Sequence, residues 1–509
     1  MPHSASQTLE APRTASSLEA HFEPFRQGIV GYDARFESAY GNQPLVYADW
    51  IASGRLYQPI EDRMTALFGP MVGNTHTEAS VTGTTMTRAY HEAQRLIKAH
   101  VHAGPDDAII MVGSGMTGAI SKFQRILGLR VPDLMQSRIR LAPAERPVVF
   151  VTHMEHHSNH TSWLESLADV VVMPAREDGL VNPDSLRHII RDYADRPLLI
   201  GSFTACSNVT GITTPYHELA RIMHEHNGYC FVDFAASAPY VDIDMHPADP
   251  MEQLDAVFFS PHKFLGGPGT PGVLIFNKRL YHNRVPDQPG GGTVNWTNPW
   301  GVHSFIDDIE AREDGGTPAF LQTIRAALAI RLKEAMGTAA MRAREEELLE
   351  TTFRRLREIP GLHILADAHI HRLGVVSFYV EGIHYNLIVR LLNDRFGIQV
   401  RGGCSCAGTY GHYLLHLDED TSNAILDQIL NHHDLSAKPG WVRLSLHPTL
   451  TDAQLVYILD AIETIVMRID EWKGDYTYVC SRNEFLHKDD RYDADEVAGW
   501  FSMGTGRSS

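Results

Sequence analysis

The chain has 509 residues, of which 43% are hydrophobic and 21% are charged, so it can bury a large core. Its 44 basic and 62 acidic residues give a formal net charge of −18, which argues against binding to nucleic acid or to an anionic membrane. No apolar stretch is long enough to span a bilayer, and the chain does not open with a basic region followed by an apolar one. Five cysteines are too few for a disulfide scaffold. We therefore expect a cytoplasmic protein.

Residues 1–20 are rich in Ser, Ala and Thr, and we expect them to form a mobile arm. After this arm, short apolar runs alternate with helical stretches over the first two thirds of the chain. This alternation predicts an α/β fold in which a mostly parallel sheet of seven strands carries helices on both faces. Ligands gather at the carboxyl ends of the strands in such folds. The strands are expected at 108–112, 148–151, 170–173, 198–203, 229–232, 256–259 and 272–276, and helices at 77–102, 119–127, 161–168, 183–193 and 216–226.

A glycine-rich turn follows the first predicted strand, with Gly113, Gly115 and Gly118 in the spacing of a dinucleotide-binding motif. That motif requires a second strand about 20 residues on that ends in an acidic residue. Residues 131–135, Val-Pro-Asp-Leu-Met, make a poor buried strand. The turn therefore predicts an anion at the N-terminus of the next helix, either a dinucleotide or a single phosphate.

Two clusters of potential metal ligands need a separate interpretation. Residues 154–160 contain three histidines and a glutamate, but adjacent side chains on an extended segment point in opposite directions. Cys404 and Cys406 are closer together than the usual zinc-ligand spacing, although His412 and His416 lie nearby. We expect no metal site, and a redox pair or two unreactive loop cysteines stay open as alternatives for Cys404 and Cys406.

Residues 258–272 place one lysine, Lys263, between an apolar strand and a glycine-rich turn. An isolated lysine is usually a surface residue, but an amine held deprotonated beside a bound aldehyde is a covalent catalyst. Ser260 and His262 supply a hydroxyl and an imidazole next to it. The sequence Ser260-Pro261-His262-Lys263 and its glycine turn resemble the cofactor-lysine segment of the class V aminotransferase family, fold type I pyridoxal 5'-phosphate (PLP) enzymes, particularly the group II cysteine desulfurase and selenocysteine lyase branch.

The resemblance covers about residues 45–470 through seven motifs in the family's order, beginning with Tyr47-Ala48-Asp49-Trp50. It implies PLP as cofactor and a single phosphate at the first turn. It also implies a homodimer, because the family's threonine at Thr317 reaches the phosphate of the neighbouring subunit. The implied cofactor-binding residues are Gly115, Met116 and Thr117 at the phosphate, His156 over the ring and able to shuttle protons, Asn208 at the phenolic oxygen, Asp233 at the pyridine nitrogen, and Ser260, His262 and Lys263.

The C-terminal third is expected to form a smaller α+β domain. Strands are predicted at 375–380, 398–401 and 441–446, and helices at 385–393 and 452–472. One or two long helices are expected before them, over 319–358. The expected divisions are a large PLP-binding domain, 21–335, whose N-terminal segment packs on the small domain; the small domain, 336–473; and an extension of unassigned role, 474–509.

The resemblance places the substrate chemistry in this small domain. Residues 401–408 are similar to the desulfurase segment that carries the persulfide-forming cysteine, which falls on Cys406. The family's substrate-carboxylate arginine falls on Arg443, a role suited to a planar guanidinium. Arg401 and His76 are further candidates for substrate binding. Ala236 departs from the family, which has glutamine there, so one hydrogen bond to the phenolic oxygen is missing or is supplied by another group.

The expected activity is therefore removal of sulfur from L-cysteine, or from a related amino acid, to give alanine and an enzyme persulfide that a sulfur-acceptor protein could receive. An epimerase, a C–S lyase or an aminotransferase acting on another amino acid is the enzymatic alternative. A non-catalytic protein that binds PLP or a sulfur-transfer partner is the alternative from another class.

Overall fold

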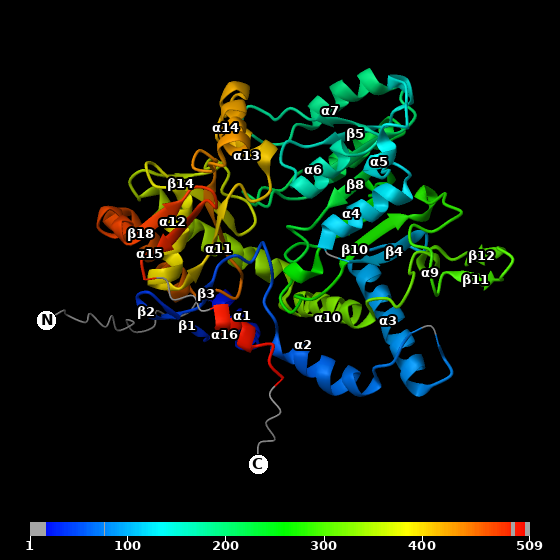
Figure 1. Ribbon diagram of the computed structural model, residues 1–509, viewed down its shortest axis with the longest axis horizontal. Helices are drawn as coiled ribbons and strands as arrows, with labels where there is room; N and C mark the ends of the chain where they lie inside the picture. The colour runs from blue at the N-terminus through cyan, green and yellow to red at the C-terminus, as the bar shows by residue number, and fades with distance from the viewer. Residues whose placement is uncertain (1–16, 76, 114, 490–493, 504–509) are drawn as a thin grey trace, which may run out of the picture.

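The computed structural model describes residues 17–75, 77–113, 115–489 and 494–503, and its two largest sheets lie side by side in Figure 1. The larger sheet has seven strands in the order β4-β10-β9-β8-β7-β5-β6. Only β10 runs against its neighbours, so the predicted α/β fold with a mostly parallel sheet is confirmed. The strands are β4 (Asp107–Val112), β5 (Val148–Val151), β6 (Asp169–Val172), β7 (Leu199–Thr204), β8 (Tyr229–Asp233), β9 (Ala256–Phe259) and β10 (Gly272–Asn277).

Helices cover both faces of this sheet because alternate strand residues feed two separate cores. Phe258 and Phe276 pack with Phe123 of α4 on one face, while Phe259 and Ile275 face the other core. Each fully buried side chain of this size contributes about 1.5–3 kcal/mol. The helices are α4 (Gly115–Ile126) and α6 (His157–Leu164) on the first face, and α3 (Val81–His100), α7 (Pro183–Ile189), α8 (Tyr216–Glu225) and α10 (Phe320–Met336) on the second.

The smaller sheet has four antiparallel strands in the order β13-β14-β17-β16 and packs against α11, α12 and α15. A short strand near the start of the chain, β3 (Val46–Tyr47), pairs in parallel with β15 in a separate two-stranded sheet. The elements are β13 (Leu362–Ile364), β14 (Val375–Val380), β15 (Ile398–Gln399), β16 (Arg401–Gly403), β17 (Trp441–Ser445), α11 (Thr338–Arg357), α12 (Tyr385–Phe396), α13 (Gly408–Leu414), α14 (Glu419–His432) and α15 (Asp452–Trp472).

Several predicted boundaries differ from those in the structure. Residues 17–20 of the expected arm belong to α1 (Ser17–Gln27). The helix expected at 161–168 starts at His157, because the His156 imidazole caps it by accepting the Ser158 N–H at 3.1 Å. The strand expected at 398–401 is divided between β15 and β16, which pair with different strands. The run expected to form one or two long helices over 319–358 forms two, which meet at Gly337, whose φ is 79°.

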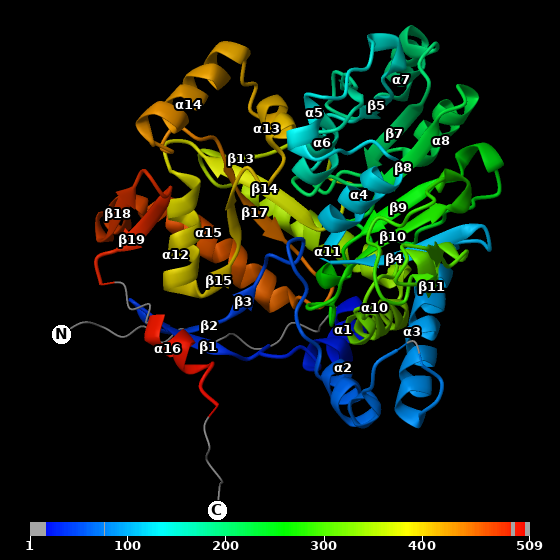
Figure 2. The ribbon, with the colours of Figure 1, turned by 45° about the vertical axis from the view of Figure 1, so that its right-hand side comes forward.

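Residues past α15 form a hairpin, β18 (Tyr476–Val479) and β19 (Glu484–His487), followed by a short helix, α16 (Ala494–Gly499). Figure 2 shows the hairpin beside α12 of the smaller domain. Within the described ranges, no helix has the length and apolar character that crossing a membrane requires.

Candidate active site

Lys263 lies in a 3-10 turn, Pro261–Lys263, directly after β9. The chain passes so close to Gly54 at this point that a Cβ on that glycine would lie 1.9 Å from the Phe264 carbonyl oxygen. The Gly54 N–H donates to the His262 carbonyl at 2.9 Å. The N-terminal segment thus clamps the lysine turn against the end of the sheet, and only glycine fits there.

The amine of Lys263 is poised to lose its proton near neutral pH. Burial lowers its pKa to about 8, and Arg443 and Arg401 act in the same direction, whereas Asp233 and Asp49 oppose the shift. At pH 7 such a lysine is about one tenth neutral, against about one part in 3000 for an ordinary lysine. A neutral amine is the nucleophile that imine chemistry needs.

Asp233 ends β8, the strand beside β9, and is 4% exposed. Its Oδ1 accepts the Ala235 N–H at 2.7 Å. Burial raises its pKa to about 6, while that hydrogen bond and the charge of Lys263 lower it. A buried carboxylate of this kind favours a cationic partner that is held against it.

The turn at the start of α4 meets the lysine segment. Gly115 has φ 63°, and a Cβ on it would lie 2.9 Å from His262 Cε1 and 3.0 Å from Ser260 Oγ. The Met116 N–H donates to Ser260 Oγ at 2.8 Å, and the Thr117 hydroxyl lies 2.6 Å from the hydroxyl of Ser158. The structure therefore brings the expected phosphate donors together with Ser260, but the Met116 N–H is already engaged.

His156 lies at the start of α6, in the same group of side chains as Lys263. Burial lowers its pKa to about 3, and the charges of Lys263 and Arg443 add to this shift. Its imidazole is consequently neutral over the physiological range, with Nδ1 accepting from Ser158. A neutral imidazole can accept a proton from a substrate carbon or hold one for it.

Asn208, after β7, connects the larger sheet with the Cys406 loop and with β17. The side-chain Nδ2 of Asn208 donates to the Ser405 backbone carbonyl at 2.7 Å. The backbone carbonyl of Asn208 accepts from Arg443 Nη1 at 3.2 Å. Asn208 Oδ1 and Arg443 Nε are buried and have no hydrogen-bond partner among the described residues. Buried polar atoms are nearly always paired, so these two atoms are candidates for contact with a ligand.

Asp49 joins both candidate substrate arginines. One carboxylate oxygen accepts from Arg443 Nη2 at 2.9 Å, and the other accepts from Arg401 Nε at 3.0 Å. The Arg443 side chain is 4% exposed and that of Arg401 is 52% exposed. The sequence interpretation missed Asp49, although a single carboxylate among the apolar residues Ala48, Trp50 and Ile51 was a possible signal.

Cys406 is exposed on the loop between β16 and α13, whereas Cys404 is partly buried against the core. The Cys406 carbonyl accepts the His157 N–H at 2.8 Å, which holds the loop against α6. Cys406 is close enough to Arg401 and Arg443 to act electrostatically on the pKa of each guanidinium. An exposed cysteine side chain is thus held at the edge of the Lys263 site.

Three other sequence-derived expectations have different outcomes. Thr317 lies exposed on the loop before α10, as a residue that reaches another subunit would. His76 lies outside the described residues. The parts of the chain that the structure describes contain no group of three or more His, Cys, Asp or Glu side chains that could hold a metal ion.

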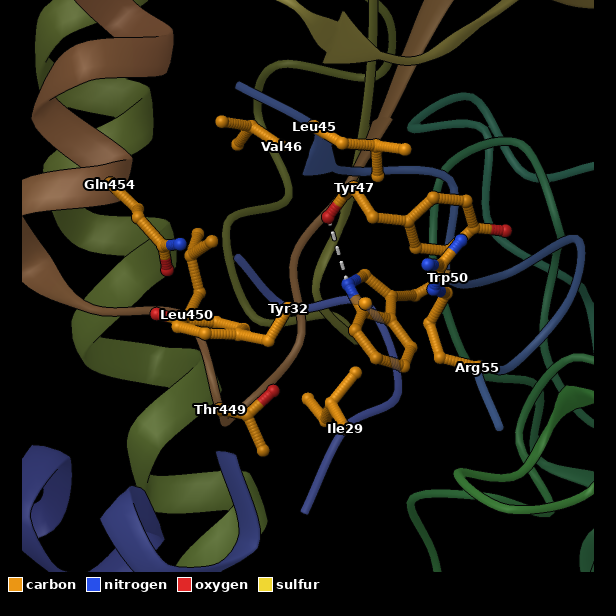
Figure 3. Close-up of a pocket in the computed structure, with 11 residues that line it drawn as sticks. Ile29, Tyr32, Leu45, Val46, Tyr47, Trp50, Arg55, Thr449, Leu450 and Gln454 are labelled. Atoms are coloured by element: carbon orange, nitrogen blue, oxygen red, sulfur yellow. Dashed lines mark hydrogen bonds between the residues drawn. The ribbon is translucent and has the colours of Figure 1, made fainter. Parts of the chain in front are cut away.

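Figure 3 shows a cavity beside Trp50, lined by residues of the N-terminal segment and of the turn before α15. Its volume is about 30 Å³. The Trp50 indole N–H donates to the Tyr47 carbonyl at 3.0 Å at its wall. This volume holds about one water molecule and is too small for an amino acid. We therefore assign the site to the group around Lys263 rather than to this cavity.

Comparisons with known proteins identify the family of the chain. The sequence pattern of the family described as Aminotransferase class-V matches residues 46–457. A probable cysteine desulfurase from Halalkalibacterium halodurans is 28% identical over 368 residues, covering 72% of this chain and 84% of that protein. A probable cysteine desulfurase from Halobacterium salinarum is 29% identical over 372 residues, covering 72% and 83%.

Solved structures show the same fold. The apo cysteine desulfurase of Thermococcus onnurineus matches with a TM-score of 0.69 at 20% identity, covering 87% of this chain and 98% of that one. A cysteine desulfurase from Escherichia coli matches with a TM-score of 0.66 at 21% identity, covering 88% and 98%. Since the family pattern spans most of the chain and the structure has the corresponding sheet and lysine turn, this protein belongs to the class V aminotransferase family.

Proposed function

We propose that this chain is a PLP-dependent cysteine desulfurase, which takes sulfur from L-cysteine or a related amino acid and leaves alanine and a persulfide on Cys406. One observation carries the proposal: an exposed cysteine is held beside the buried lysine and arginine of a class V site. The names of the relatives support it, because those proteins are described as cysteine desulfurases.

The described residues fit PLP. Lys263 offers an amine with a lowered pKa, Asp233 a buried carboxylate for the ring nitrogen, and the turn at Gly115 a backbone that approaches closely enough for a phosphate. The unpaired Asn208 Oδ1 lies in the same site. Bound PLP would act as an electron sink for the charge left on the substrate's α-carbon.

Binding of the substrate falls to the arginines. Arg443 has an unpaired Nε, so a substrate carboxylate can accept from the guanidinium while Asp49 keeps Nη2. This contact orients the amino acid with its amine toward Lys263. His156, neutral at physiological pH, or Lys263 in its free-base form, then moves the α-proton.

Cys406 performs the sulfur step. Its thiolate sulfur bonds to the substrate sulfur as the substrate Cβ–S bond breaks, and that electron pair remains with Cβ. Cβ then takes up a proton and becomes the methyl group of alanine, while Cys406 retains the persulfide. Because the loop is exposed at Cys406, the persulfide can be passed to an acceptor thiol without unfolding.

A homodimer is part of the proposal. Thr317 is exposed on its own subunit, so its expected phosphate contact requires a second copy. Sedimentation of the purified protein tests this, and a fully active monomer would exclude the phosphate role of Thr317.

The deciding experiment measures alanine, sulfide and persulfide together, with L-cysteine as substrate. We expect the wild type to form alanine and Cys406→Ala to exchange the substrate α-proton without releasing sulfur. Cys404→Ala should stay within about tenfold of the wild type, because that side chain is packed away from the solvent-facing edge. Equal alanine from the wild type and Cys406→Ala would refute the persulfide mechanism in favour of a lyase, and racemised substrate would identify an epimerase.

A further inference from the structure

The C-terminal hairpin β18–β19 lies outside the segment that matches the family, residues 46–457. It runs along α12, with its open end near the C-terminus of that helix and its turn near the N-terminus (Figure 2). α12 in turn packs against β16, the strand that leads into the Cys406 loop. The hairpin is therefore connected to the loop through one helix.

The open end of the hairpin is firmly anchored. The Tyr476 hydroxyl donates to Asp394 Oδ2 at 3.0 Å, and the Tyr40 hydroxyl donates to Asp475 Oδ2 at 2.8 Å. His487 Nε2 lies 3.0 Å from the Tyr40 hydroxyl. These contacts, with Tyr476 buried in the small-domain core, fix the hairpin in place independently of its turn.

The turn makes a second, separate set of contacts centred on Asn483. This residue has φ 54°, a left-handed conformation that asparagine tolerates. Its side-chain Nδ2 donates to the Tyr385 hydroxyl at 2.8 Å, and its backbone carbonyl accepts from Asn386 Nδ2 at 2.6 Å. The Tyr478 hydroxyl donates to Asn483 Oδ1 at 2.9 Å, so the amide is held from both sides.

Tyr385 and Asn386 also pack against glycines beside the Cys406 loop. A Cβ on Gly402 would lie 2.3 Å from Asn386 Oδ1 and 3.2 Å from the Tyr385 ring. A Cβ on Gly440 would lie 2.6 Å from the Tyr385 ring and 2.9 Å from Gly403 Cα. The Tyr385 side chain is thus in van der Waals contact with the two strands that flank the start of the loop.

The loop itself needs such support. Gly403, Ser405 and Cys406 have φ values of 109°, 52° and 57°, and two of these residues carry a Cβ. Left-handed conformations at residues other than glycine cost energy and persist only where the surroundings hold them. His157 and Asn208 hold the loop through hydrogen bonds, and Tyr385 packs against Gly402 in the strand that leads into it.

We infer that the hairpin β18–β19 positions the nucleophile loop, with Asn483 and Tyr385 as positioning residues for Cys406. This inference rests on the proposed function of Cys406. Two hydrogen bonds also hold the segment that precedes Trp441. The Leu435 N–H donates to the carbonyl of Cys480 in the hairpin turn at 3.0 Å, and the hydroxyl of Tyr385 in α12 donates to the Lys438 carbonyl at 3.3 Å.

The test compares Asn483→Gly and Tyr385→Phe with the wild-type holoenzyme. Glycine keeps the left-handed backbone at 483 unstrained, so the first variant removes only the side-chain contacts, and phenylalanine keeps the ring at 385. Arg482→Ala is the control, because Arg482 is 64% exposed in the same turn and pairs with Glu484 of the hairpin. The measurements are amide hydrogen exchange at residues 401–408 and the kcat and KM for alanine formation from L-cysteine.

We expect exchange at 401–408 to rise about tenfold or more in both variants and to be unchanged in Arg482→Ala. kcat should fall about 10- to 100-fold, since displacement of a reacting group by about 1 Å has effects of this size, with KM and PLP content unchanged. Wild-type exchange at these amides, or an equal rise across the whole small domain, would overturn the inference. The exchange measurement needs no turnover, so a wild type that makes no alanine refutes the proposed function and leaves this test intact.

Discussion

Lys263 and Cys406 carry the two halves of the proposed reaction in opposite kinds of surroundings. Lys263 follows a strand that is buried on both faces, and burial changes its pKa. Cys406 is exposed on a loop with left-handed backbone, held by a few hydrogen bonds. Proton chemistry benefits from a fixed, poorly solvated site, whereas a cysteine that receives sulfur and passes it on needs access. The buried sheet and the exposed loop therefore suit different steps.

The largest effect on activity should follow from removing Lys263, the covalent group in the buried part of the site. Lys263→Ala should lower alanine formation by about a thousandfold or more, because both the covalent amine and a proton-transfer group are lost. In the wild type, borohydride treatment with PLP should label the peptide that contains Lys263, as read by mass spectrometry. A label on another lysine would contradict the assignment, and circular dichroism controls for folding of the variant.

Asp233→Asn tests the same half with a smaller change. A neutral amide cannot keep the ring nitrogen protonated, so substrate α-proton exchange should slow by about a hundredfold while PLP stays bound. Exchange of deuterium into the substrate measures this step without Cys406. Thr204→Ser, on the neighbouring strand, is a control that keeps the buried hydroxyl, and unchanged exchange in Asp233→Asn would exclude the role.

Asp49→Asn tests the carboxylate that pairs with both buried Arg443 and exposed Arg401. Loss of its charge leaves one more positive charge at Arg443 and Arg401, so the KM for L-cysteine should fall about fivefold. Because a buried pair is broken, the free energy of unfolding should fall by about 3 kcal/mol, measured by urea denaturation. Asp33→Asn, at an exposed aspartate of the same N-terminal segment, is the matched control. A raised KM would show that Asp49 orients Arg443 rather than competing for it.

The smallest effect is a shift in pH dependence. The pKa of Lys263 is lowered to about 8, so PLP uptake by the apo-protein should rise from pH 6.5 to about 8.5 and then level off. Asp233 raises this pKa, so in Asp233→Asn the midpoint should move below pH 8. Absorbance during uptake measures both curves, and a midpoint near that of free lysine would contradict the burial of the amine.

The sequence alone determined the sheet and the lysine turn. Buried strands are short runs of apolar residues, so all seven could be located before the structure, and Lys263 and Asp233 follow directly from the strands that precede them. These features depend on neighbours in the chain. The family resemblance indicated the remaining site residues by position, without their contacts.

Tertiary structure decided everything that depends on groups far apart in the sequence. Asp49 meets Arg443 across 394 residues and Arg401 across 352, which no local pattern reports. The same is true of the contact between Tyr385 and Asn483, and of the left-handed backbone at Cys406, which its neighbours impose. Local periodicity specifies which residues are buried, whereas the pairing of charges and the support of strained loops arise only when distant segments pack together.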